Sequence, residues 1–112
     1  MRNKRTVYVA EDAAFFLDNF EAILLCQGCP RALVEQFAFE LFDILVGRLP
    51  TGTWTDRAQY IGLDPFHPMH SQYTFTEGYV SGLYSANEGQ VVLYAITIAV
   101  PVFEPLSATA VA

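Results

Sequence analysis

Residues 12–47, DAAFFLDNFEAILLCQGCPRALVEQFAFELFDILVG, decide the fold class of this 112-residue chain. Large apolar side chains recur in them every three or four residues, which is the period of a helix with one buried face. Gly28 lies where a helix end needs a left-handed residue, and Pro30 suits the first position of a new helix. The stretch therefore predicts two helices, residues 12–27 and 30–47, joined by a short turn as an antiparallel hairpin.

After a turn at residues 49–52, the pattern changes to the period-two alternation of strands. The loop at residues 64–70 contains two prolines, which exclude regular structure there. Strands are predicted at residues 6–9, 53–61, 72–76, 79–85 and 90–103. We expect one α+β domain over residues 1–112, in the order β-α-α-β-β-β-β. The antiparallel helical hairpin packs on one face of a mostly antiparallel four- to five-stranded sheet.

The last two predicted strands are joined by residues 87–89, whose sequence Asn-Glu-Gly is typical of a hairpin loop. We expect Gly89 to supply the positive φ that such a loop needs. A three-residue loop places Gly82 opposite Tyr94, whose ring would cover the gap that the glycine leaves.

Charged residues are scarce in this chain. They make up 16% of it, whereas about 25% is typical of soluble domains, and hydrophobic residues make up 53%. So few charges do not cover the surface of a monomer evenly, so we expect some apolar surface to contact a partner. Both faces of the last predicted strand are apolar, and the helical hairpin covers only one of them. The surplus surface predicts a homodimer or a complex with another protein.

The charges are also unevenly distributed along the chain. Up to Arg57 there are six basic and eight acidic residues, and beyond it four acidic residues and no basic one. Nucleic-acid affinity comes largely from Lys and Arg that neutralise phosphates, so this distribution argues against direct nucleic-acid binding. The acids are too scattered to imitate the dense charge of a duplex.

No stretch of the sequence has the length of a membrane anchor or a secretory signal. The basic N-terminus is followed by only five apolar or small residues before Glu11 and Asp12. The uncharged run at residues 89–103 is shorter than the roughly 20 residues of a membrane helix and contains Pro101. We therefore expect a soluble, cytoplasmic protein with no membrane partner.

Two cysteine and two histidine residues form a candidate zinc site. Cys26 and Cys29 make a C-x2-C pair, and His67 and His70 make an H-x2-H pair. Thiolate and imidazole are ligands that zinc prefers in structural sites. The alternative is that Cys26 packs as a small hydrophobic residue and that both histidines are solvated, with no cofactor bound.

A catalytic interpretation combines Asp64 with His67 or His70 as an oriented general base. No nucleophile elbow, phosphate loop or dinucleotide fingerprint accompanies them, so the enzyme class stays open and no catalytic residue is assigned. A related alternative is a small-ligand pocket in a cone-shaped α+β domain, with Trp54 beside the two histidines.

Aromatic side chains are the better candidates for a functional surface, because large amphipathic rings are enriched at interface hot spots. Two of them, Phe15 and Phe39, interrupt the polar stripes of the predicted helices. The interface candidates are Phe15, Phe39, Tyr73, Phe75, Tyr79, Tyr84 and Tyr94. Small size, acidity and lack of motifs resemble those of small inhibitor proteins of viruses and mobile elements. We expect a non-catalytic regulator or inhibitor that binds another protein.

Overall fold

The computed structural model describes residues 4–52, 58–67 and 69–99. Its elements follow the predicted order β-α-α-β-β-β-β, with two short helical turns after the second helix. They are β1 (Thr6–Val9), α1 (Glu11–Cys26), α2 (Arg31–Asp43), η1 (Ile44–Arg48), α3 (Leu49–Thr51), β2 (Ala58–Leu63), β3 (Ser71–Glu77), β4 (Val80–Ala86) and β5 (Gln90–Ile98). The predicted α+β fold class is confirmed.

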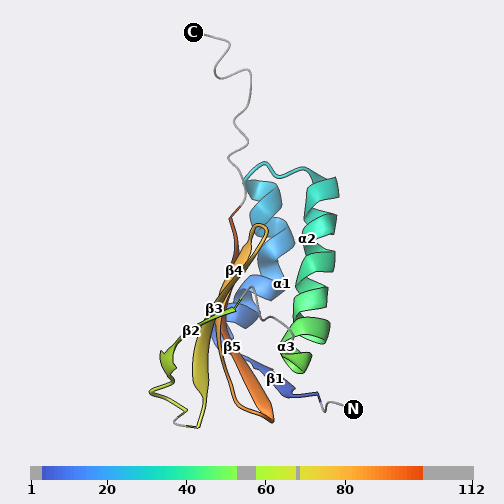
Figure 1. The fold of residues 1–112 in the computed structure, drawn as a ribbon. Coiled ribbons are helices and arrows are strands. Elements are labelled where there is room, and N and C mark those ends of the chain that lie inside the picture. The colour runs from blue at the N-terminus through green and yellow to red at the C-terminus, as the bar shows by residue number, and fades with distance from the viewer. Residues whose placement is uncertain (1–3, 53–57, 68, 100–112) are drawn as a thin grey trace, which may run out of the picture.

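The five strands form one sheet in the order β1-β5-β4-β3-β2. β1 runs parallel to β5, and the other neighbouring strands are antiparallel. A parallel pair needs a long crossover connection, and the chain supplies it with α1, α2 and three antiparallel strands. Both long helices lie on the same side of the sheet (Figure 1). The described structure therefore has one helical layer and one sheet layer.

The turn between α1 and α2 follows from the local sequence. Gly28 has φ +86°, and its N–H bonds the carbonyl of Leu25 at 3.0 Å. The N–H of Cys29 bonds the carbonyl of Leu24 at 3.0 Å. This pair of hydrogen bonds is the Schellman motif, so Gly28 ends α1 as predicted. Pro30 caps α2 from just outside the helix, and the first helical residue is Arg31.

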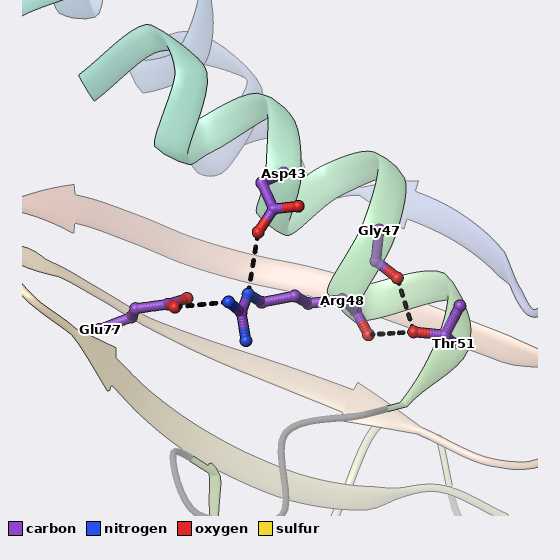
Figure 2. A network of polar contacts seen from close by, with 5 residues as sticks. All are labelled: Asp43, Gly47, Arg48, Thr51 and Glu77. Carbon is purple, nitrogen blue, oxygen red and sulfur yellow. Dashed lines mark hydrogen bonds and ion pairs between the residues drawn. The ribbon is translucent and has the colours of Figure 1, made fainter. Parts of the chain in front are cut away.

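The end of α2 differs from the uniform helix predicted to residue 47. A π-helical turn, η1, follows Asp43, and Gly52 with φ +67° ends α3. Arg48 in η1 pairs with the carboxylates of Asp43 and Glu77, each at 2.9 Å (Figure 2). Because Glu77 ends β3, Arg48 ties the helical layer to the sheet.

The core lies between the helices and one face of the sheet. Strand side chains alternate between this face and the opposite one, which we call the open face. The buried strand residues Phe75, Val80, Tyr84, Ala86, Val91, Leu93, Ile96 and Ile98 face the helices. The alternate positions give the open face, which consists of Thr6, Tyr8, Gln59, Gln72, Thr74, Thr76, Ser81, Leu83, Ser85, Gln90, Val92, Tyr94, Ala95 and Thr97.

The predicted register of the β4–β5 hairpin is wrong by one residue next to the loop and by two residues beyond a bulge. Asn87 pairs with Gln90 through an N–H···O bond of 3.0 Å, and the Asn87 side chain accepts the N–H groups of Gly89 and Gln90. The asparagine side chain thus organises the loop, and Gly89 has no positive φ.

Further along this hairpin, Gly82 pairs with Ile96, and a bulge leaves Tyr94 as an extra residue between Leu93 and Ala95. The ring that covers Gly82 belongs to Phe75 in β3 and not to Tyr94, as had been predicted. A Cβ atom added at Gly82 would lie 2.5 Å from this ring. The aromatic cover of the glycine is therefore present, but it comes from a different strand.

The remaining strands agree with the prediction in number but not in their bounds. β2 covers Ala58–Leu63 and ends two residues later than the predicted strand at 53–61, and β5 ends at Ile98. Residues 53–57, with Trp54 and the predicted strand start, lie outside the described residues, as do residues 100–103 at the predicted strand end.

Candidate functional site

A buried carboxylate organises the loop between β2 and β3. The Asp64 side chain is only 1% exposed. It accepts a 2.6 Å hydrogen bond from the Tyr94 hydroxyl and a 2.8 Å bond from the N–H of Phe66. Charged groups are seldom buried unless they are paired or hydrogen-bonded. Asp64 meets this condition through Tyr94, which lies 30 residues later in the chain.

The two histidines of the loop continue the cluster. His70 is buried, and its Nδ1 lies 3.1 Å from the hydroxyl of Ser85, which is fully buried in β4. The Ser85 hydroxyl also bonds the Asp64 carboxylate. The His67 ring stacks on His70, with ring centres 5.0 Å apart, and on Tyr94 at 6.3 Å. These five residues, Asp64, His67, His70, Ser85 and Tyr94, form what we call the loop staple.

The electrostatics of the loop staple keep Asp64 ionised. Burial alone would raise the pKa of this carboxyl, but hydrogen bonds from Tyr94, Phe66, Ser85 and His67 outweigh burial and lower the pKa. For Tyr94, burial and then the hydrogen bond to Asp64 both raise the pKa of the phenol. A neutral phenol thus donates to a carboxylate, which is a strong, charge-assisted hydrogen bond.

The geometry of the loop staple suits a structural role. A general base has to reach a proton of the substrate, and a nucleophile has to be accessible. Asp64, His70 and Ser85 are buried and Tyr94 is half-buried. Among the five side chains of the loop staple, only His67 is exposed. The cluster fastens the β2–β3 loop onto the open face, since both Ser85 and Tyr94 project there.

The predicted four-ligand zinc site is not formed. Cys26 and Cys29 lie at the α1–α2 turn, whereas His67 and His70 lie in the β2–β3 loop at the opposite end of the fold (Figure 1). Both cysteines are free, Cys26 exposed and Cys29 buried. Within residues 4–52, 58–67 and 69–99, no three His, Cys, Asp or Glu side chains gather closely enough to hold a metal ion.

The outer face of the helical hairpin carries exposed aromatic side chains. Phe39 is 77% exposed, Phe42 65% and Val46 48%, and Phe15 on α1 is exposed too. Phe39 and Phe42 of α2 and Val46 of η1 form what we call the α2 stripe. Sequence reasoning singled out Phe15 and Phe39 but missed Phe42 and Val46. Phe42 follows Phe39 by three residues and Val46 follows Phe42 by four, a spacing that places them on one side of a helix and could have identified them.

The aromatic residues predicted on the sheet have different surroundings. Phe75 and Tyr84 are buried under the helices, so a partner cannot reach them in this structure. Tyr73 is half-buried and stacks on Tyr84, with ring centres 5.3 Å apart. Tyr79 is exposed and forms a T-shaped contact with Phe37, with ring centres 6.0 Å apart. Tyr94 belongs to the loop staple.

Acidic side chains dominate the charged surface of α1 and α2. The exposed acids of α1 and α2 are Glu11, Asp12, Asp18, Glu21, Glu35 and Asp43. The basic residues of these helices and η1 are Arg31 and Arg48, and Arg48 is engaged by Asp43 and Glu77. A hollow of about 500 Å³ opens on the same hairpin. It is lined by Leu17, Asp18, Asn19, Phe20, Glu21, Ala22, Leu25 and Arg31.

Within the described residues, every helix is too short or too polar to cross a membrane. No protein-family model, curated protein or solved structure matches the chain. The residues and contacts described above are therefore the basis for a function.

Proposed function

We propose that this chain is a small non-catalytic regulator or inhibitor that binds another protein through the outer face of its helical hairpin. The observation that carries the proposal is the α2 stripe. Val34, Phe37 and Leu41 already bury the inner face of the same helix. Apolar side chains on the outer face add nothing to this core, so a partner gives them a role.

The spacing of the α2 stripe favours a helical partner. Phe39, Phe42 and Val46 follow one another at intervals of three and four residues. This is the repeat of a coiled-coil seam, in which side chains of one helix insert between those of another. An amphipathic helix laid along α2 and η1 would cover all three side chains.

The charges beside the α2 stripe favour a basic partner. Acidic residues dominate the exposed surface of α1 and α2, and complementary charge speeds association and excludes wrong partners. The hollow beside Arg31 joins apolar walls, such as Leu17 and Leu25, to the carboxylates of Asp18 and Glu21. Such a hollow suits an anchoring side chain with an apolar stem and a positive end.

Two double variants test this proposal by affinity capture from the native host followed by binding measurements with the captured protein. Phe39→Ser with Phe42→Ser removes most of the α2 stripe, and we expect it to weaken binding at least tenfold. An aromatic hot spot contributes about 2 kcal/mol or more to the binding free energy, which corresponds to about 30-fold in the dissociation constant. Ile61→Ser with Leu63→Ser removes two exposed apolar residues of β2 and is the matched control.

Salt dependence adds a second readout. The affinity of the unmodified chain should fall as ionic strength rises, because the acids of α1 and α2 are exposed and screened. A partner that binds both double variants equally well would contradict the proposal, and so would a partner that is acidic where it contacts this chain.

A further inference from the structure

We infer that the open face of the sheet binds a second copy of this chain, sheet against sheet, so that the protein is a homodimer whose helical layers point outward. This surface is distinct from the outer face of the helical hairpin, so the inference does not depend on the proposed function. It rests on where the charged side chains lie, on the size of the face and on the loop staple.

None of the open-face residues named above carries a charged side chain. Its cross-strand rows run Thr76–Ser81–Thr97, Gln59–Thr74–Leu83–Ala95 and Gln72–Ser85–Val92–Tyr8. Within described residues 58–67 and 69–99, the charged residues are Asp64, Glu77 and Glu88. Asp64 is buried, Glu77 reaches Arg48 on the helical side, and Glu88 lies at the tip of a hairpin. Two open faces can therefore meet without burying or opposing charges.

The net charge of the chain makes this orientation the favourable one for self-association. Each copy has a formal charge of −6, and the exposed acids of α1 and α2 are on the helical side. Packed sheets are about 10 Å apart, and a helical layer adds about 10 Å on each side. The acidic layers would thus be separated by about 30 Å, several times the Debye length of about 8 Å. Pairing through the helices would bring the acids of both copies together.

The size of the open face suits a modest dimer. Five strands at about 4.8 Å spacing and seven residues at about 3.3 Å per residue give a face of roughly 24 by 23 Å. That is roughly 550 Å² per copy, including the part that the β2–β3 loop covers, compared with about 800 Å² in a standard interface. Half-buried Leu83 and Val92 supply apolar contacts near the centre. We therefore expect a reversible dimer.

The loop staple covers one end of this face and adds side chains of the β2–β3 loop to the surface. Ser85 and Tyr94 project from the open face and hold the β2–β3 loop through Asp64 and His70. The same loop presents Phe66, 79% exposed, and Met69, 83% exposed. Hydrogen bonds at Asp64 and His70 hold the two ends of the loop against the sheet, so both side chains are presented beside the open face.

The oligomeric state of the full chain tests the inference. Sedimentation equilibrium over a range of concentrations should show a reversible dimer. Thr76→Glu with Thr97→Glu places two charges on exposed positions of the open face, and we expect it to raise the dimer dissociation constant at least tenfold. Gln36→Glu adds a charge on exposed α2 and is the matched control, with an unchanged dissociation constant. Circular dichroism confirms that each variant is folded.

A photo-crosslinking residue locates the interface independently of stability. Placed at Thr76 it should yield covalent dimers, and placed at Gln36 it should not. A strictly monomeric full chain overturns the inference. So does a dimer that resists the two glutamates on the open face but dissociates in the Phe39→Ser, Phe42→Ser variant. That helical variant should still dimerise while losing its partner, so failure of the dimer and failure of the proposed function are distinguishable.

Discussion

The hydroxyl of Tyr94 donates a 2.6 Å hydrogen bond to the buried carboxylate of Asp64, which lies 30 residues earlier in the chain. Tyr94 is the extra residue of a bulge in β5, and the bulge places both Tyr94 and Ala95 on the open face between Leu93 and Ile96. A backbone irregularity in the central part of the sheet thus brings a phenol to the loop that it fastens.

Removing this hydroxyl should destabilise the fold. Tyr94→Phe leaves the carboxylate of Asp64 buried with one donor fewer, and hydrogen bonds to charged groups contribute about 1.5–3 kcal/mol. We expect a loss of this size in the free energy of unfolding, measured with urea. Tyr8→Phe, at an exposed position of the open face, is the control and should change stability by less than about 0.5 kcal/mol. Equal effects of both variants would contradict a special role for the Tyr94 hydroxyl.

Acid should weaken the fold through Asp64. The pKa of this carboxyl is lowered in the folded state from its ordinary value of 3.8, so the unfolded chain binds the proton more tightly. The stabilisation is complete well above pH 3.8 and is lost as the pH falls through 3.8 towards the lower folded pKa. Urea unfolding from pH 7 to pH 3 measures this loss. Asp64→Asn should be less stable at pH 7 and show a shallower acid slope, and an unchanged slope would argue against the assignment.

Glu40 should show the opposite dependence on pH. Burial, and then the charge of Glu77, raise the pKa of Glu40 above its ordinary value of 4.5. The folded chain therefore binds this proton more tightly, and the contribution of Glu40 to stability is greatest below pH 4.5 and lost as the pH rises through the folded pKa. Glu40→Gln should remove the loss of stability that accompanies ionisation of Glu40. At pH 7 we expect this variant to be at least as stable as the unmodified chain. Marked destabilisation of Glu40→Gln at pH 7 would contradict the raised pKa of Glu40.

Gly82 should tolerate no side chain. A Cβ atom there would lie 2.5 Å from both the Ala95 carbonyl oxygen and the Phe75 ring, so the sheet or the ring has to shift. Overpacking of this kind costs about 1–3 kcal/mol, and we expect Gly82→Ala to lose that much stability by thermal or urea unfolding. Gly89→Ala is the matched control, because its Cβ atom would approach the Asn87 side chain only to 3.9 Å, an ordinary contact. Similar losses in both variants would contradict the steric explanation.

The predictions from sequence succeeded where neighbouring residues decide the structure. The α1–α2 turn depends on Gly28 and on hydrogen bonds within six residues, and its position was predicted. The β4–β5 loop was located, but its closing pair depends on the Asn87 side chain and was assigned one residue too early. For the candidate sites, Phe15 and Phe39 were found on exposed helix faces, whereas Phe75 and Tyr84 were expected at an interface and lie in the core.

By itself, the sequence determined the helical hairpin, the alternation of the strands and the concentration of basic residues in the first half of the chain. These features depend on residue type and on spacings of two to four residues, which local backbone geometry translates directly into helices and strands. Only the tertiary structure decided the strand register, its two bulges, the partners of Asp64 and the separation of the cysteine and histidine pairs. A shift of one residue in a strand moves every side chain to the other face, and only packing against distant residues selects the register.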